Sequence, residues 1–355
     1  MNTPRLEIDC AKIVANAKQL ISILKPHGIS IVPVTKVFMG HPAVAASLIL
    51  SGVKMLADSR IENIERMRHA GITIPMMLIR TPMLSQVERV VLNCEISLNT
   101  ELIVIRALSK AAKSAGFLHG VIVMVELGDL REGIMPDKLF DIIRQTLRLS
   151  NITLKGIGAN LTCRYGVAPQ QDNMDFLAKL AKEAETLFGI RFEIISGGNS
   201  ANLLWALDLD PHVHNGVNQL RLGEAIYFGV EALYKHPIAG AHTDIVTLVA
   251  EVIESNIKPS IPKGRRSINA FGEMPQVIDR GQVKQGLLAL GRQDVNPLGI
   301  IPPRGITIVA SCSDHLVVES AGVALQVGQE IRFKLDYSGL LSAMTSPYVS
   351  KYFYH

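Results

Sequence analysis

The sequence predicts an α/β fold: a (β/α)8 barrel of the TIM type, followed by a mostly β C-terminal domain. Between residues 31 and 223, eight short apolar runs alternate with segments of helical length, as in parallel strands that helices cover on both faces. From residue 245 onward, apolar runs are separated by Gly, Pro and Asp, as in antiparallel strands. Eight strand–helix units in about 235 residues match the size of a barrel, and a doubly wound open sheet is the alternative.

Each predicted barrel strand is short and nearly all apolar. In chain order these strands cover residues 31–36, 54–58, 75–80, 95–98, 120–127, 154–160, 192–196 and 218–223. The segments between them have the apolar period of amphipathic helices, as in "RIENIERMRHAG". The C-terminal strand candidates are residues 245–254, 285–290, 305–311, 315–320 and 330–337, and "SGLLSAMT" is a candidate helix.

The change of pattern after "YKHPIAGAHTD" predicts two domains, which also suits a chain of 355 residues. We place the barrel in residues 1–235 and the β domain in residues 236–355. Residues 1–9 include a strand-like run at residues 5–8 and are candidates for pairing with the β domain.

The composition argues against several classes of function. The chain is 48% hydrophobic and 19% charged, with a net charge of +4 and no basic block interleaved with aromatic residues, so nucleic acid and membrane surfaces are not expected partners. No apolar run reaches the roughly 18 residues of a membrane helix, and "MNTPRLEIDC" lacks the apolar core of a signal peptide. Cys10, Cys94, Cys163 and Cys312 lie far apart. Free thiols in the cytoplasm are therefore expected.

In a barrel the active site lies at the carboxyl ends of the strands, so the polar residues that follow each predicted strand form the candidate site. They are Lys36; Asp58, Ser59 and Arg60; Arg80; Asn99; Asp129 and Arg131; Asn160; Gly197 to Ser200; and Arg221 with Glu224. One lysine, several arginines and a Gly-rich turn together indicate an anionic ligand and an available amine.

Two segments of this rim indicate a cofactor. In "SGGNSAN", two glycines let the backbone approach a ligand, and Asn199 or Ser200 can cap the next helix, which favours a phosphate; a plain capped turn is the alternative. In "VPVTKVFMGHP", Lys36 ends an apolar run. A desolvated lysine amine is a nucleophile toward aldehydes, whereas a lysine that extends to solvent is the alternative. An aldehyde that carries a phosphate and binds a lysine is pyridoxal phosphate, which we predict here.

Three other features have structural explanations. His212 and His214 in "DPHVHNG" have the spacing of metal ligands but no evident third ligand, so no metal site is predicted. Trp205 in "LLWAL" lies at helical spacing and is expected in the core. Cys312 stands near Asp314 and His315, as in a nucleophile set, but packing at a strand edge explains this equally well.

Motifs along the whole chain resemble one family. "VPVTKVFMGH", "LADSR", "GNSAN", "LRLGEAIYFG", "LALGRQD", "SDHLVVE" and "AMTSPYVSK" are similar, in the same order, to blocks of the alanine racemase family, the fold-type III pyridoxal-phosphate enzymes. The ornithine racemase-like branch is the most similar. The resemblance implies a pyridoxal 5'-phosphate-dependent amino-acid racemase whose substrate is a basic amino acid (ornithine or lysine) or alanine. It also implies a head-to-tail homodimer, in which the β domain completes the active site of the neighbouring subunit.

The resemblance also implies roles for single residues. Lys36 would hold the cofactor covalently, Arg221 would face the pyridine nitrogen, and Arg131 would lie near the phenolic oxygen. The phosphate would be bound by the Ser200 side chain, the backbone N–H groups of Gly223 and Glu224, and the Tyr348 hydroxyl. Asn160 stands where alanine racemases usually have a histidine near the ring.

Two departures from the family concern phosphate binding and the second acid/base. Alanine racemases have a phosphate-binding tyrosine soon after the lysine, whereas residues 37–40 here lead to His41, for which a structural role is expected. Arg292 stands near the position of the family's catalytic tyrosine. Because racemisation needs a proton donor on each face, we expect the β domain to supply or orient the second one through Arg292, Asp294, Asp314 or His315. Glu224, Asp129 and Asp294 are candidate anions for a distal ammonium.

Two other functions use the same cofactor. One is a different fold-type III enzyme: a decarboxylase, a D-amino-acid aldolase or a dehydratase. Decarboxylases of this fold pair the pyridine nitrogen with glutamate, whereas "RLGE" offers Arg221, and aldolases and dehydratases need a metal. The other is a non-catalytic pyridoxal-phosphate carrier, a class that has the barrel alone.

Overall fold

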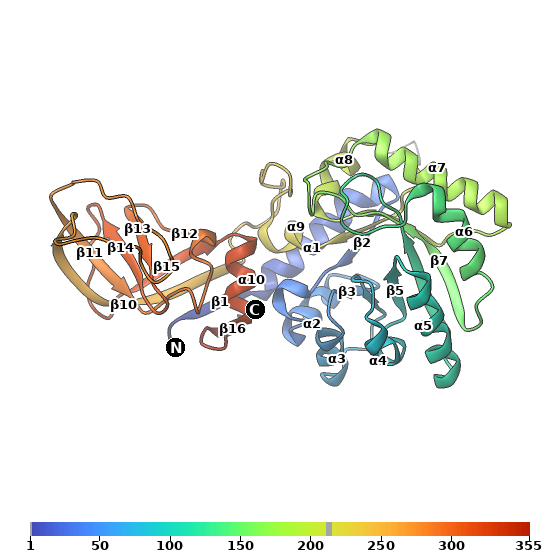
Figure 1. Ribbon diagram of the computed structural model, residues 1–355, viewed down its shortest axis with the longest axis horizontal. Coiled ribbons are helices and arrows are strands. Elements are labelled where there is room, and N and C mark those ends of the chain that lie inside the picture. The colour runs from blue at the N-terminus through green and yellow to red at the C-terminus, as the bar shows by residue number, and fades with distance from the viewer. Residues whose placement is uncertain (1, 211–214) are drawn as a thin grey trace. The chain divides into compact units, whose positions relative to one another are not determined.

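The computed structural model describes residues 2–210 and 215–355. The chain forms two compact units, Asp9–Ile245 and a second unit made of the N-terminal residues up to Ile8 together with Val246–Tyr354 (Figure 1). None of the described helices is both long enough and apolar enough to cross a membrane.

The larger unit is a parallel barrel of eight strands. Its strands are β2 (Ser30–Pro33), β3 (Leu56–Asp58), β4 (Met76–Leu78), β5 (Ile96–Asn99), β6 (His119–Met124), β7 (Ile152–Gly158), β8 (Ile194–Gly198) and β9 (Gln219–Leu222). They pair in the order β2-β9-β8-β7-β6-β5-β4-β3, and a parallel bridge between Val34 and Ala57 joins the two end strands. The predicted (β/α)8 barrel is confirmed, because an open sheet would leave these ends unpaired.

Helices cover the outside of the barrel (Figure 1). They are α2 (Pro42–Leu50), α3 (Ile61–His69), α4 (Val87–Asn93), α5 (Leu102–Ala115), α6 (Pro136–Thr146), α7 (Gln171–Phe188), α8 (Leu203–Asp208) and α9 (Glu224–Phe228). Trp205 of α8 is buried, as expected. A further helix, α1 (Cys10–Leu24), precedes the first barrel strand and was not predicted. Its buried residues Ile13, Ala17, Leu20 and Leu24 recur with a helical period.

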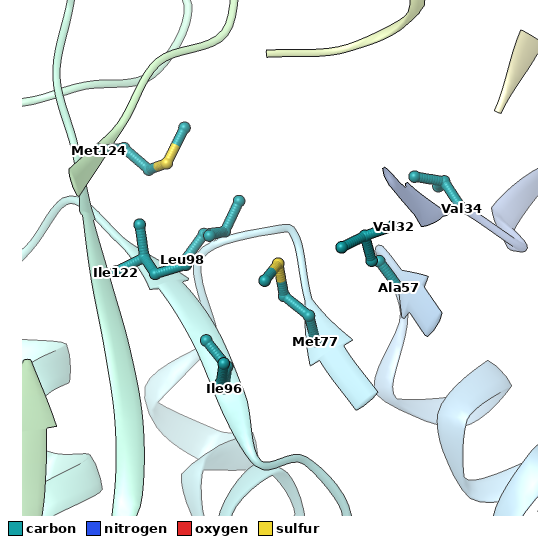
Figure 2. Close-up of a cluster of buried hydrophobic side chains, with 8 residues drawn as sticks. All are labelled: Val32, Val34, Ala57, Met77, Ile96, Leu98, Ile122 and Met124. Atoms are coloured by element: carbon teal, nitrogen blue, oxygen red, sulfur yellow. The ribbon is translucent and has the colours of Figure 1, made fainter. Parts of the chain in front are cut away.

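The barrel interior is filled by apolar side chains. Alternate residues of neighbouring strands point inward and form one cluster, made of Val32, Val34, Ala57, Met77, Ile96, Leu98, Ile122 and Met124 (Figure 2). A barrel packed in this way is a core and not a pore. Polar chemistry is therefore confined to the ends of the strands.

The second unit is mostly antiparallel β structure. Its strands are β1 (Arg5–Asp9), β10 (Val246–Pro259), β11 (Gln282–Leu288), β12 (Ile300–Ile301), β13 (Ile306–Ser311), β14 (Leu316–Ser320), β15 (Glu330–Leu335) and β16 (Ser350–Tyr354), with one helix, α10 (Tyr337–Thr345). β1 pairs antiparallel with β10, with Arg5 opposite Val249. The mostly β second part of the fold is confirmed, and the candidate helix "SGLLSAMT" lies in α10; β12 and β16 were not predicted.

Candidate active site

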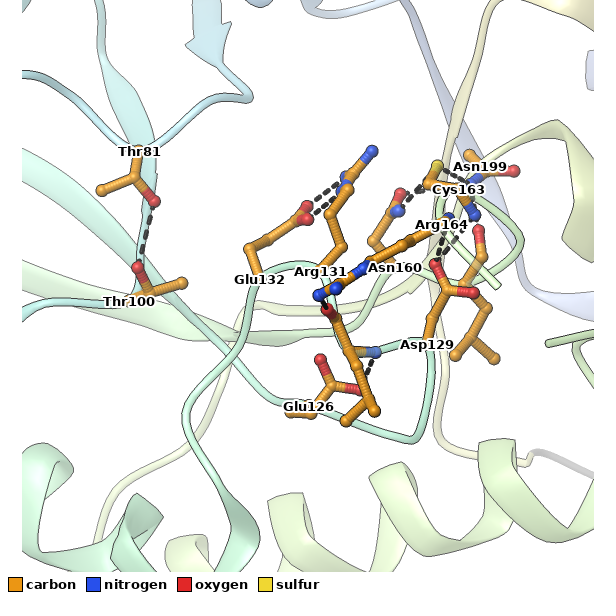
Figure 3. Close-up of polar contacts among 12 residues, drawn as sticks. Thr81, Thr100, Glu126, Asp129, Arg131, Glu132, Asn160, Cys163, Arg164 and Asn199 are labelled. Carbon is orange, nitrogen blue, oxygen red and sulfur yellow. Dashed lines mark hydrogen bonds and ion pairs between the residues drawn. The ribbon is translucent and has the colours of Figure 1, made fainter. Parts of the chain in front are cut away.

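Polar side chains from several loops gather at the end of the barrel where the parallel strands have their carboxyl termini, here called the mouth. Figure 3 shows ten labelled residues from the loops that follow β4 to β8. They are Thr81, Thr100, Glu126, Asp129, Arg131, Glu132, Asn160, Cys163, Arg164 and Asn199. The same end of β2 leads to Lys36, so the loops of most strands contribute to one candidate site.

Lys36 lies in a turn beyond its strand and not at the strand's tip. β2 ends at Pro33, and Lys36 opens the 3-10 turn η2 (Lys36–Phe38). Its side chain is exposed between buried Thr35 and Val37, so the expected desolvated pocket is not formed by the barrel unit itself. The chain turns after Thr35, because the N–H of Phe38 donates to the Thr35 carbonyl at 3.0 Å and the N–H of Met39 donates to the Lys36 carbonyl at 3.0 Å.

A buried aspartate fixes this turn. The Asp58 carboxyl is fully buried and accepts hydrogen bonds from the Thr35 hydroxyl at 2.7 Å and the Asn63 amide at 2.9 Å. Burial raises the pKa of Asp58, although these hydrogen bonds oppose the rise. Gly40 closes the turn at φ +60°, where a Cβ would lie 2.5 Å from the Asn63 carbonyl oxygen. Asp58 therefore holds the Lys36 turn against β3.

Two further rim candidates are structural. The Asn99 side chain is buried and donates to the Ser97 carbonyl at 2.9 Å and to its hydroxyl at 3.0 Å. His41 caps α2, because its Nδ1 accepts the N–H of Ala43 at 3.3 Å, and burial followed by the charge of Arg66 lowers its pKa. The structural role expected of His41 thus matches its position.

Arg221 lies inside β9, and not after it as predicted, with only 4% of its surface exposed. Its guanidinium donates to the Ala159 carbonyl at 2.8 Å and to the Ser196 hydroxyl. Across residues 2–210 and 215–355, no carboxylate lies within 4.0 Å of it as an ion-pair partner. Burial lowers the pKa of Arg221 to about 10, so it remains a cation at neutral pH. A guanidinium has five N–H donors, so Arg221 can donate hydrogen bonds to a ligand at the mouth.

The predicted phosphate turn converges on the hydroxyl of Ser200. That hydroxyl accepts the backbone N–H of Gly223 at 3.3 Å and of Ala225 at 3.1 Å, whereas phosphate binding by the N–H groups of Gly223 and Glu224 stays a prediction. Asn199 caps the turn, because its side chain accepts the N–H of Ala201 at 2.8 Å. Gly198 has φ +148°, and a Cβ there would lie 2.2 Å from Asn202 Oδ1. The turn therefore requires glycine at this position.

Asn160 and Asn199 form a cluster with a thiol that the sequence reasoning did not select. The Asn160 amide donates to Cys163 Sγ at 3.0 Å, and the Asn199 amide donates to Asn160 Oδ1 at 3.1 Å (Figure 3). Cys163 is exposed. The sequence around Cys163 has no helical or strand period. Only its position in the loop that follows β7 could have indicated that it lies at the mouth.

Asp129 organises the loops after β6 and β7. Its buried carboxylate accepts the backbone N–H groups of Cys163 at 2.8 Å, Arg164 at 2.9 Å, Tyr165 at 3.1 Å and Val167 at 3.2 Å. Burial alone would raise the pKa of Asp129, but the four N–H groups outweigh it and lower the pKa. Asp129 is thus engaged by its own protein and is not available to a distal ammonium.

Replacing Asp129 by asparagine is expected to lower the free energy of unfolding by about 2–4 kcal/mol, because one amide oxygen replaces two charged acceptors. Since the folded pKa lies below the unfolded one, the stabilisation is present above about pH 4 and is lost as the pH falls further. Urea unfolding at pH 7 and pH 3 measures both effects. Asp141→Asn, at an exposed aspartate of α6, is the control and should change stability by under about 0.5 kcal/mol; an equal loss in both variants contradicts the prediction.

Comparisons with known proteins agree with this geometry. Residues 8–231 match the family described as alanine racemase, N-terminal domain. The chain is 36% identical to the ornithine racemase of Acetoanaerobium sticklandii over 352 residues, which are 98% of this chain and 99% of that protein. The chain belongs to the alanine racemase family. It is also 37% identical to the lysine racemase of Thermotoga maritima over 350 residues, 98% of each chain. The predicted resemblance is confirmed, and the chain is an amino-acid racemase, an isomerase.

Solved structures of the family share this fold. The alanine racemase of Streptomyces lavendulae superposes with a TM-score of 0.78 at 17% identity, over 100% of this chain and 98% of that one. The alanine racemase of Clostridium difficile 630 gives a TM-score of 0.75 at 19% identity, over 100% and 96% of the two chains. At these identities the likeness concerns the fold alone.

Two of the four predicted acid/base candidates of the racemase's β unit, Arg292 and Asp294, lie in one loop. The N–H of Arg292 donates to the Cys312 carbonyl at 2.9 Å, while the Arg292 guanidinium donates to Glu273 at 3.0 Å and lies 3.8 Å from the centre of the Phe271 ring. Asp294 accepts the N–H of Gly291 at 2.8 Å, and burial raises its pKa. Asp294 is therefore engaged by its own loop, which makes it a poor anion for a substrate ammonium.

The remaining candidates of the β unit are exposed or only locally bonded. Asp314 accepts the Gln293 amide at 2.6 Å. His315 and Tyr348 are both exposed. His212 and His214 lie outside the described residues, and within the described ranges no three His, Cys, Asp or Glu side chains are grouped to hold a metal ion.

Proposed function

We propose that this racemase uses pyridoxal 5'-phosphate to interconvert the L- and D-forms of a basic amino acid, ornithine or lysine. The cofactor assignment is supported by the donors at the mouth and by family membership. The substrate assignment is supported by the two relatives at 36% and 37% identity, which are an ornithine racemase and a lysine racemase over nearly the whole chain.

The residues of the mouth fit pyridoxal phosphate. The observation that carries this proposal is Arg221, a buried cation with no carboxylate partner in the described chain, because a neutral ring nitrogen is an acceptor that such a donor can serve. The N–H groups that converge at Ser200 suit a phosphate, since backbone donors at turns bind anions. Lys36 follows β2, the strand that pairs with the Arg221 strand, and would hold the cofactor covalently.

Each residue then has one task. The bound cofactor would withdraw electrons from the substrate's Cα and so make its proton acidic. The Lys36 amine takes or returns that proton on one face of the carbon. Arg221 holds the ring nitrogen as an acceptor and keeps it unprotonated, because an arginine does not give up its own proton. Ser200 and the adjacent N–H groups would hold the phosphate, and the Arg131 guanidinium would donate to the phenolic oxygen.

We further infer a head-to-tail homodimer in which the β unit of one copy closes the mouth of the other. The exposure of Lys36 supports this inference, because a lysine nucleophile needs a desolvated surrounding that the barrel unit alone does not provide. Arg292, Asp294, Asp314 and His315, with Tyr348 at the phosphate, are the residues that such a contact would bring in. A fully active monomer in sedimentation and activity measurements would contradict it.

The proposed function is tested by incubating the cofactor-loaded protein separately with L-ornithine, L-lysine and L-alanine. Chiral chromatography should detect the D-form of ornithine or lysine, with a higher kcat/KM than for alanine. The same samples are assayed for carbon dioxide, released aldehyde and ammonia, the products of a decarboxylase, an aldolase and a dehydratase. Formation of any of these without D-product, or no turnover at all, contradicts the racemase proposal.

A further inference from the structure

A basic substrate places a second ammonium at the mouth, where it needs an anion. Most carboxylates of the barrel loops are already engaged. Asp58 and Asp129 are fully buried and bonded to their own turns. Glu126 is buried and accepts the N–H groups of Gly128 at 2.6 Å and Leu130 at 3.0 Å. Glu224, predicted as an anion for the substrate, is paired with Lys235.

Glu132 differs from the three buried carboxylates, and like Glu224 it is paired with a basic side chain. It lies in the loop after β6, with 27% of its side chain exposed, and its two oxygens accept from Nε and Nη2 of Arg131 (Figure 3). Burial lowers the pKa of Arg221, and the negative charge of Glu132 opposes that change, so the charge of Glu132 acts on Arg221. Glu132 is therefore a carboxylate at the mouth that accepts no hydrogen bond from a backbone N–H of the described residues.

The loop that carries Glu132 is held rigidly. Glu126 ties its first half through the two N–H groups above, and the Ile134 N–H donates back to the Met124 carbonyl at 2.8 Å. Gly133 has φ +150°, and a Cβ there would lie 2.3 Å from the Glu126 nitrogen, so only glycine fits. Asp129 ties the same loop to residues 163–167. The backbone that carries Glu132 is thus held in place before any substrate binds, which reduces the entropy lost on binding.

We propose that Glu132 recognises the distal ammonium of the basic amino-acid substrate. This inference rests on the proposed function and names the residue that selects a basic substrate. A carboxylate has about four acceptor sites. Arg131 occupies one on each oxygen, so one on each oxygen remains for the ammonium. The Arg131 guanidinium orients the carboxylate, and the carboxylate in turn screens the substrate's ammonium from the charge of Arg131.

The test compares Glu132→Gln with the wild type on two substrates that differ only in the distal amine, L-ornithine and L-norvaline. Glutamine keeps the size of the side chain and removes the charge. The kcat/KM for ornithine should fall about 10- to 100-fold relative to that for norvaline, the loss of one charge-assisted hydrogen bond. Most of the change should lie in KM, since the ammonium is distant from the reacting carbon. Glu132→Asp, which keeps the charge, should lose less.

Glu65→Gln is the matched control, because Glu65 also forms an ion pair with an arginine, Arg89, but on the outer helices; it should leave both kcat/KM values unchanged. Equal losses for ornithine and norvaline in Glu132→Gln would mean that Glu132 only orients Arg131, which overturns the proposal, as would no change for either. A wild type that racemises alanine or norvaline but neither ornithine nor lysine overturns the proposed substrate class, and the role of Glu132 with it.

Discussion

Lys36→Ala is expected to lower the rate of racemisation by at least about 10²–10⁴-fold, the range for loss of a proton-transferring side chain. The physical reason is that the amine both holds the cofactor and moves the Cα proton, and alanine does neither. The rate is measured from D-product by chiral chromatography. Covalent attachment is measured separately, by borohydride reduction and peptide mass mapping, which should place the cofactor on Lys36 in the wild type.

The matched control is Lys54→Ala. Lys54 is also exposed, but it precedes β3 and so lies toward the amino ends of the strands. This variant should keep the wild-type rate and the label on Lys36. A label on any other lysine in the wild type, or full activity in Lys36→Ala, would exclude Lys36 as the cofactor-binding residue.

Arg221→Gln is expected to have the second largest effect, a decrease in racemisation of about 10²–10³-fold, the range for removal of one preorganised donor. A neutral amide does not repel a proton from the ring nitrogen as a guanidinium does, so transamination should rise at the same time. Both are measured in one experiment, from D-product and from the 2-oxo acid formed. A variant that keeps its rate and forms no oxo acid contradicts the assigned role.

Thermal stability separates this role from a structural one. Arg221 is buried without a carboxylate partner in the described chain, and removal of a buried charge of this kind relieves a desolvation cost. The melting temperature of the cofactor-free Arg221→Gln protein should therefore equal or exceed that of the wild type. Arg221→Lys, which keeps the charge but loses the planar fork of donors, should recover part of the activity. A lower melting temperature with no recovery by lysine would indicate that Arg221 serves packing instead.

The barrel could be predicted because parallel strands buried on both faces must be apolar along their whole length. The run "MML" at β4 and the run "VIVM" within β6 show this directly. The same reasoning missed α1, although its apolar positions follow a helical period, because the first strand–helix unit was taken to begin at residue 31. It also extended β2 to Lys36, since the apolar run does not show that the chain turns after Thr35, where the Phe38 N–H donates to the Thr35 carbonyl at 3.0 Å.

The sequence by itself determined which residue types meet at the mouth, because the order of strands and loops places Lys36, Arg221 and the "SGGNSAN" turn at the same ends of parallel strands. Only the tertiary structure decided which acidic groups remain available there. Asp129 and Glu132 stand three residues apart, and their sequence context does not separate them. Asp129 is taken by N–H groups 34 to 38 residues further along the chain, whereas Glu132 is bonded by the side chain of its neighbour Arg131. Such a difference depends on contacts between distant segments, which form only when the two loops pack together.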